Sequence, residues 1–392
     1  MLAFRTARSK RAGTARVAGS PRESEQSRNR LRTNYAAMII LAQKLLSFSD
    51  LAEQMSAFLA RDPTLENYWR AVILFGQNVA SYKFALAKSL IELSSNAGEK
   101  IRLEELAEPF SRNLLEHLAK SPKQATSRSS KFLDACRKFS EEQISKDELI
   151  GQTVRLGFQN VIDAFHVVNR GEISVRFFRD DRKNGGGIIL TDDLMKLRER
   201  FQFVNLPKEI EARWRLVETA WQLGLSRSAI VVDVENESLG ISTGGRRSNL
   251  TGCRDALNGY QKGKCFYCFR DIAIENSSEL LADIDHFFPV ALRAAGGILP
   301  FDGVWNLVLA CRHCNRGVGG KSSRIPASRF LDRLNTRNEF LISSHHPLRE
   351  TLIAQTGSEA RQRVHFPKDM YQSSRELLIH EWDCKPQNAA CF

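Results

Sequence analysis

Apolar residues recur every three or four positions through much of the first 240 residues of this 392-residue chain. This spacing puts them on one face of a helix. It predicts helices within residues 64–94, 101–119, 131–143 and 147–169. Another helix is expected after Thr191, where Asp192 and Asp193 favour a helix start, and a further one from Pro207. Residues 38–240 are therefore predicted to form a mostly helical domain with a recognition or regulatory role.

An alternating pattern interrupts the helices near residues 173–190. Ile173, Val175 and Phe177 alternate with other residues, residues 184–187 read Asn-Gly-Gly-Gly, and Ile188–Leu190 continue as a second apolar run. The pattern predicts a β-hairpin. The glycines lack the following lysine of a phosphate-binding loop, so we interpret them as the hairpin turn.

The remaining third of the chain divides into three predicted parts. Residues 241–251 are rich in Gly, Ser and Arg, which is typical of a linker. Residues 252–330 form a cysteine-containing module, and residues 331–392 a helical extension. Its helices are expected at Phe330–Ile342, Arg349–Thr356 and Arg375–Trp382. The fold class predicted from these parts is α+β.

Within the module, two short strands are predicted. Residues 281–288 alternate apolar and polar positions and stop at Pro289, so Asp285 and His286 lie where the first strand ends. A second strand covers residues 304–310, which include Asn306. Glycines 296 and 297 and Pro300 suit a chain reversal between the two strands. Asn315, just beyond the second strand, is expected to open a helix.

The net charge of +12 is unevenly distributed. Residues 1–37 hold nine basic and two acidic groups, and residues 246–333 hold thirteen and eight, whereas the rest of the chain is balanced. A surface that binds phosphates concentrates positive charge where it meets them, so the module is expected to bind DNA. The alternative is an ordinary solvated basic face.

Residues 1–37 are rich in Arg and Ser and lack the apolar centre of a secretory signal. We interpret them as a disordered basic tail or as an extension upstream of a true start at Met38, with an organellar transit peptide as the alternative. No apolar run reaches the roughly 18 residues of a membrane helix. A soluble, cytoplasmic protein without a membrane partner is expected.

Eight cysteines without a secretory signal do not predict a disulfide framework. Cys136 lies on an apolar helical face, and Cys253, Cys384 and Cys391 have no partner at ligand spacing. The other four form two Cys-x-x-Cys pairs, Cys265/Cys268 and Cys311/Cys314. Two such pairs complete a tetrahedral zinc site that has no open position, so the zinc is expected to be structural. A redox dithiol is the less favoured alternative, and so is His313 as a ligand.

The combined pattern is Cys-x-x-Cys, Asp-His-x-x-Pro, Asn-Leu and Cys-x-x-Cys-Asn, over residues 260–325. In this order it resembles the HNH endonuclease family. The resemblance implies a ββα-metal core with His286, Asn306, Asp285 and Asn315 as its catalytic residues. The family often has a lysine three residues beyond the asparagine, but Val318 stands there and Lys321 comes later.

Phosphodiester hydrolysis gives each of these residue types a task. His286 would take a proton from water, and Asn306 would orient it, directly or through a nearby backbone group. Asp285 and Asn315 offer oxygen ligands to Mg²⁺ or another hard divalent ion. The structural alternatives are that Asp285 caps a turn, Asn306 holds a loop and Asn315 is a helix N-cap.

Four basic residues near the second cysteine pair are candidate phosphate contacts, with surface charge as the alternative. They are Arg312, Arg316, Lys321 and Arg324. The predicted function is metal-dependent hydrolysis of DNA, in restriction or defence by analogy. The alternatives are a non-catalytic zinc module that binds nucleic acid and a homing or mobile-element nuclease. The pattern does not indicate an oligomeric state.

Overall fold

The structure is a computed structural model that describes most of residues 55–392. The segments outside the description are residues 1–54, 77–79, 95–99, 128, 169–170, 223–229, 234–237, 244–245, 295–300, 302 and 345. The predicted basic tail, Met38 and the glycines at 296 and 297 therefore lie outside the described residues. Residues Asp50–Phe392 form one compact unit of mixed α+β class. Among the described residues, no helix is both long and apolar enough to cross a membrane.

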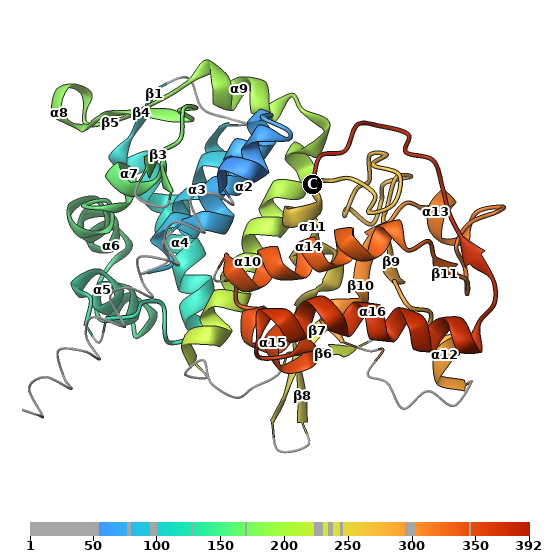
Figure 1. The fold of residues 1–392 in the computed structure, drawn as a ribbon. Coiled ribbons are helices and arrows are strands. Elements are labelled where there is room, and N and C mark those ends of the chain that lie inside the picture. The colour runs from blue at the N-terminus through green and yellow to red at the C-terminus, as the bar shows by residue number, and fades with distance from the viewer. Residues whose placement is uncertain are drawn as a thin grey trace, which may run out of the picture. The chain divides into compact units, whose positions relative to one another are not determined.

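Helices dominate the first part of this unit, as the apolar spacing predicts (Figure 1). They are α2 (Leu65–Phe75), α3 (Tyr82–Ser94), α4 (Leu103–Lys120), α5 (Lys131–Ser140), α6 (Lys146–Gln152), the π-helical turn η1 (Thr153–Gly157) and α7 (Val161–Ala164). The predicted helical run 64–94 is two helices, because the backbone becomes extended at Gly76. Cys136 lies buried in α5, which confirms it as a core residue, and burial raises the pKa of its thiol to about 12.

The predicted hairpin is part of a three-stranded antiparallel sheet. Its strands β1 (Lys100–Arg102), β5 (Gly187–Leu190) and β4 (Phe178–Asp181) lie in the order β1-β5-β4. The short helix α8 (Arg182–Gly185) forms the connection, which ends at Gly186 with a φ of +68°. The first hairpin strand begins at Phe178, later than predicted, and residues 100–102 pair with β5 instead of opening a helix. Another small hairpin, β2 (Val167–Val168) with β3 (Gly171–Glu172), follows α7.

Residues 191–252 continue as helices and then as a second sheet. The elements are α9 (Asp192–Arg198), the 3₁₀ turn η2 (Phe201–Asn205), α10 (Leu206–Gln222), β6 (Ile230–Asp233), β7 (Ser238–Thr243) and β8 (Arg246–Gly252). Both helices predicted here are confirmed. The predicted linker 241–251 is instead part of the antiparallel sheet β6-β7-β8. A sheet ladder uses backbone groups, which every residue type supplies, so a composition rich in Gly and Ser did not reveal it.

The cysteine module and the C-terminal helices complete the unit. The module contains α11 (Cys253–Gln261), β9 (Asp283–His286), α12 (Ala291–Ala294), η3 (Val304–Asn306), β10 (Leu307–Ala310) and α13 (Arg312–Arg316). Beyond it follow β11 (Ile325–Pro326), α14 (Arg329–Ser343), α15 (Arg349–Thr356), α16 (Ala360–Leu377) and β12 (Glu381–Trp382). The predictions of α14 and α15 are confirmed. The last predicted helix, 375–382, is wrong in its bounds, because α16 ends at Leu377 and β12 pairs with β11.

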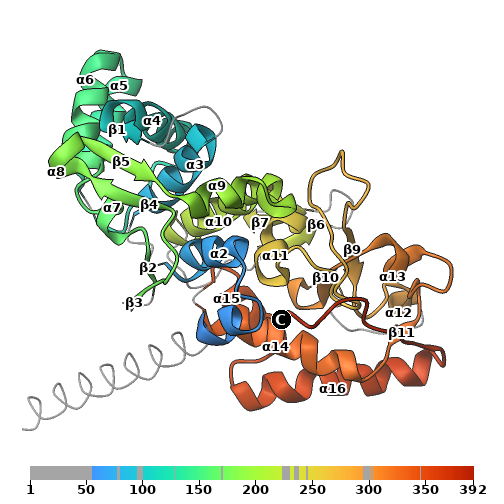
Figure 2. The same cartoon turned by 90° about the horizontal axis from the view of Figure 1, so that it is seen from above.

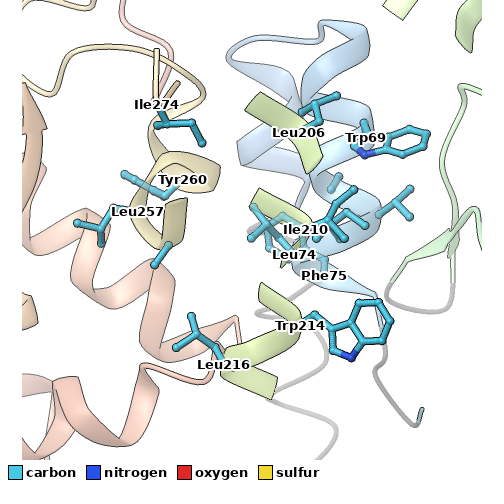
Figure 3. Close-up of a cluster of buried hydrophobic side chains, with 14 of the residues drawn as sticks. Trp69, Leu74, Phe75, Leu206, Ile210, Trp214, Leu216, Leu257, Tyr260 and Ile274 are labelled. Atoms are coloured by element: carbon cyan, nitrogen blue, oxygen red, sulfur yellow. The ribbon is translucent and has the colours of Figure 1, made fainter. Parts of the chain in front are cut away.

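The module packs on the helical part through helices α2, α10 and α11. Figure 3 shows side chains of the three helices in one buried cluster, with Trp214 on α10 and Tyr260 on α11 among them. A buried polar network runs through the same place. The guanidinium of Arg70 donates two hydrogen bonds of 2.8 Å to Glu209, and the Asn258 amide donates a third of 2.8 Å. Since Arg70, Glu209 and Asn258 come from α2, α10 and α11, the three helices form one core.

A buried histidine joins α4 to α10. The His117 ring stacks on Trp214 at 3.5 Å between ring centroids, and its two nitrogens lie 2.7 Å from Glu218 and 3.1 Å from Glu211. Burial by itself would lower the pKa of His117, but the hydrogen bonds and charges of the two carboxylates raise it above the ordinary value. Burial opposes ionisation of Glu211, yet His117 and Lys88 lower its pKa.

These two shifts predict how stability depends on pH. The His117 contribution is complete below the unfolded pKa of about 6.5 and is lost as the pH rises through the higher folded pKa. The Glu211 contribution is present above about pH 4.5 and is lost as the pH falls toward its lower folded pKa. We therefore expect the unfolding free energy of the natural chain to decline above neutral pH in denaturant titrations, and that of His117→Gln to show less of this decline. His365→Gln, at an exposed histidine, is the control and should retain that decline.

Candidate metal centre and the strands beside it

Four buried thiols converge in the cysteine module. The Sγ atoms of Cys265, Cys268, Cys311 and Cys314 all lie within 4.8 Å of one another, and those of Cys268 and Cys311 are 3.8 Å apart. Sulfurs bound at roughly 2.3 Å to one tetrahedral ion would be about 3.8 Å apart. The cluster predicted from the two Cys-x-x-Cys pairs is thus confirmed, and its four thiols fit a metal ion such as zinc.

The first cysteine pair lies in a tight turn after α11. The Cys265 amide donates to the Arg270 carbonyl at 2.8 Å, and the Phe269 amide donates to the Cys265 carbonyl at 3.0 Å. Phe269 closes this turn with a φ of +62°. The turn is also tied to β10, because the Phe266 amide donates to the Leu309 carbonyl at 2.9 Å.

The second cysteine pair lies at the start of α13. Cys311 follows β10 directly and is the N-cap residue of the helix, and Cys314 lies one turn later. One helical turn brings both thiols to the same side. Burial raises the pKa of the Cys265 thiol, so ionising this thiol without a cation would be unfavourable. A bound divalent ion would stabilise the thiolate form that burial opposes.

A fifth thiol was missed by the sequence reasoning. Cys384, for which no partner at ligand spacing was found, lies with its Sγ atom 4.0 Å from that of Cys314. Three residues later, the backbone N–H of Gln387 donates to the Cys268 carbonyl at 2.8 Å. Seventy residues separate Cys314 from Cys384, so local spacing holds no signal for this contact.

The two predicted strands of the module pair with each other. Strands β9 and β10 are antiparallel, with His286 opposite Leu307 and Asp285 opposite Val308 (Figure 2). The predicted second strand began at residue 304, but residues 304–306 form the 3₁₀ turn η3 before β10. Helix α11 covers the outer edge of β10, since the Gln261 amide group exchanges two hydrogen bonds of 2.8 Å with the Leu309 backbone.

Asn306 is buried and holds the chain that follows His286. Its Oδ1 accepts from the Phe288 amide at 2.8 Å, and its Nδ2 donates to the carbonyls of Phe288 at 3.0 Å and Phe301 at 2.8 Å. The Phe287 amide donates to the Asn306 carbonyl at 2.8 Å. Asn306 therefore holds a loop, the structural alternative, and through it fixes the backbone beside His286.

Asp285 is buried between two donors. The Tyr267 hydroxyl donates to its Oδ2 at 2.6 Å, and the Lys321 ammonium donates to its Oδ1 at 2.8 Å. Lys321 also donates to the His286 carbonyl at 2.8 Å. Because Tyr267 lies between Cys265 and Cys268, it links the cysteine cluster to the Asp285 carboxylate.

The predicted role of Lys321 as a phosphate contact is therefore wrong. A phosphate contact needs an exposed ammonium, whereas the Lys321 side chain is 1% exposed and forms an ion pair with Asp285. Arg312 is exposed, as a phosphate contact requires. The Arg324 guanidinium, partly exposed, donates to the Gly319 carbonyl at 2.8 Å.

Asn315 is held near β9 by a residue that the sequence reasoning did not select. Its Nδ2 donates to Asp283 Oδ2 at 3.2 Å, and the Arg316 guanidinium binds both oxygens of the same carboxylate at 2.9 and 3.0 Å. Cys311, not Asn315, is the N-cap of α13, so the helix-opening prediction and the N-cap alternative are both wrong. The signal available in the sequence for Asp283 was an acidic residue within the alternating run 281–288 that predicted the strand.

His286 ends β9 and is partly exposed, unlike its buried neighbours Asp285 and Phe287. His313, considered as an alternative metal ligand, is exposed and is not one of the four clustered residues. Among the described residues, the four thiols are the only group of three or more Cys, His, Asp or Glu side chains placed to share an ion.

The chain was compared with protein-family models, curated proteins and solved structures, and none of them matches it.

The four thiols predict that the metal supports the fold of the module. Structural zinc binds with a free energy of roughly 10 to 16 kcal/mol at neutral pH, which is comparable with the roughly 5 to 15 kcal/mol by which a small domain is stable. We expect purified protein to contain one zinc per chain, and a strong chelator to lower the melting temperature measured by circular dichroism. Zinc should restore it. Unchanged melting after complete metal removal would contradict this.

Lys321 offers a second test, of its buried role. Replacing it with Ala leaves the Asp285 charge buried without its partner, which costs about 3 to 5 kcal/mol in comparable pairs. We expect Lys321→Ala to lower the unfolding free energy by about that amount in denaturant titrations. Arg312→Ala, at an exposed position, should leave it within about 0.5 kcal/mol. Equal stability of the two variants would mean that the ion pair is unimportant.

Proposed function

We propose that this protein is an HNH-type endonuclease that hydrolyses phosphodiester bonds of DNA, with His286 as the general base and one hard divalent ion. The observation that carries the proposal is the position of His286. It ends a strand whose partner leads straight into the cysteine-clustered helix α13. The order of strand, strand and helix agrees with what the resemblance implies.

The surroundings of His286 suit proton transfer from water. The residue is partly exposed, although its Nε2 atom is buried, and the backbone at and just after His286 is held by Lys321 and Asn306. A general base must be held in position and still reach solvent and substrate. Asn306 would serve this reaction indirectly, since its hydrogen bonds are to the loop backbone after His286.

Asp285 and Asn315 are the residues that would hold the hard ion. Carboxylate and amide oxygens are the ligands that Mg²⁺ prefers, and such an ion would neutralise charge on the phosphoryl oxygens. Each Asp285 oxygen accepts one hydrogen bond, which leaves further lone-pair capacity on the carboxylate. These are the donor types that a hard ion would take; in the structure Asn315 is held by Asp283, and the Lys321 ammonium lies 2.8 Å from Asp285 Oδ1.

The proposed DNA substrate is supported by charge on the same module. Residues 246–333 hold thirteen basic and eight acidic groups, and Arg312 and Arg316 on α13 are both exposed. Such arginines would contact the phosphate backbone without reading its sequence. By analogy, a large helical part joined to a nuclease module fits restriction or defence, where it selects a target or senses a trigger.

A non-catalytic zinc module that binds nucleic acid is the second candidate. One observation favours it: Tyr267 and Lys321 already satisfy both oxygens of Asp285, so the polar centre is stable without an added ion. In that case Asp285, Asn306 and Asn315 would be parts of a scaffold, and the exposed arginines would be the working residues.

Replacing His286 separates these two functions. We expect the natural chain to nick plasmid DNA with Mg²⁺ or Mn²⁺, and His286→Ala to reduce the rate by roughly 10² to 10⁴, the usual contribution of a general base. DNA binding, measured by gel shift, should be unchanged. His313→Ala is the matched control, since it removes an exposed histidine of the same module and should cleave normally.

The opposite result is equally clear. A natural chain that binds DNA but leaves plasmid and varied DNA and RNA substrates intact, across several divalent ions, would favour the binding module. Equal rates for His286→Ala and the natural chain would show that another residue is the base.

A further inference from the structure

The fifth thiol beside the metal cluster is fastened in place from both sides. Before it, β12 pairs with β11, and the Arg329 guanidinium binds Asp383 at 2.9 Å. At the thiol itself, the Cys384 amide donates to Asp383 Oδ1 at 2.8 Å. After it, the amide of Gln387 binds the carbonyl of Cys268. The backbone around Cys384 is therefore held close to the cluster by the fold.

A tetrahedral ion has no place for this thiol. Four thiolates complete the zinc coordination, so one of the five sulfurs is left over. Cys384 is the one that remains partly exposed, whereas the four clustered cysteines are buried. Small oxidants dissolved in water would thus reach Cys384 before the metal-bound sulfurs.

We propose that Cys384 is a site of reversible oxidation, which forms a disulfide with Cys314 and releases the metal ion. The inference rests on the four-thiol metal site and is independent of the proposed nuclease function. Its carrying observation is the 4.0 Å separation between the two Sγ atoms, which is comparable with the separations inside the cluster. A disulfide of about 2.05 Å would need the two sulfurs to approach each other by roughly 2 Å.

The oxidant is hydrogen peroxide. The Cys384 sulfur attacks one peroxide oxygen, the O–O bond breaks, and a sulfenic acid and water form. The Cys314 sulfur then attacks the sulfenic sulfur, so that an S–S bond forms, the S–O bond breaks and hydroxide leaves, taking up a proton to become water. Two thiols are oxidised and one peroxide is reduced to two water molecules. A bound ion would then have only three thiolate ligands, and it would be released.

The main alternative is that the cluster oxidises by itself. Cys268 and Cys311 are 3.8 Å apart and would form a disulfide without Cys384. Both are buried, and both would be bound to the ion. The two routes differ in the disulfide that forms and in whether Cys384 is needed, and each difference can be measured.

The experiment follows zinc and disulfides in the same sample. Full-length protein with one zinc per chain is treated with excess hydrogen peroxide, and released zinc is read with a chromogenic chelator. We expect one zinc per chain to be released, a peptide linked through Cys314 and Cys384 in mass spectra, and recovery with dithiothreitol and zinc. Cys384→Ser and Cys384→Ala should bind zinc normally and release it roughly tenfold more slowly. Cys391→Ala, on the same C-terminal segment, should behave like the natural chain.

Three outcomes would overturn the proposal. One is equal zinc release from the natural chain and both Cys384 variants. Another is a disulfide that joins two of the four clustered cysteines in the natural chain. The third is a natural chain that contains no metal, which removes the site on which the proposal rests. None of these outcomes depends on DNA cleavage, so the proposed nuclease function is tested separately.

Discussion

The convergence of four buried thiols is the constraint on which the cysteine module depends. Strands β9 and β10 contain four residues each, and a two-stranded sheet of that length has little stability of its own. The thiols join the turn at residues 265–268 to the start of α13, and the strands lie between these two points. Without a cation that binds thiolates, the same four groups would be neutral thiols, which pack as small apolar groups and do not link the two segments. Metal binding at the four thiols would therefore stabilise the fold of the module.

Two buried carboxylates extend this scaffold toward the candidate site. Asp285 binds Tyr267 from the first cysteine turn and Lys321 from beyond α13, and Asp283 binds Asn315 and Arg316 within α13. Both therefore tie β9 to segments next to the cysteines. Buried ion pairs contribute little net stability, but their directional hydrogen bonds favour one arrangement over others. Under the proposed function, that preference would help to hold His286 at a fixed place while it remains partly exposed.

The helical part and the module share one core, which bears on how they would work together. Arg70, Glu209 and Asn258 link α2, α10 and α11 through short hydrogen bonds inside an apolar cluster. Gln202 adds a contact from η2 to the Ile272 carbonyl at 3.1 Å, close to the first cysteine turn. A change in the helical part would thus act on the module through packed side chains and not through a tether.

The sequence by itself determined the features that depend on local spacing. Apolar periodicity located α2, α10, α14 and α15, and the acidic start signal located α9. The Cys-x-x-Cys spacing predicted the thiol cluster, and alternation placed His286 at a strand end. Only the tertiary structure decided which distant segments meet. It turned the predicted linker into sheet, buried Lys321 against Asp285, and brought Cys384 to Cys314 across seventy residues. The physical reason is that helical periodicity and chelate spacing are set by neighbours along the chain, whereas strand pairing, ion pairing and thiol contacts depend on which parts of the chain pack together.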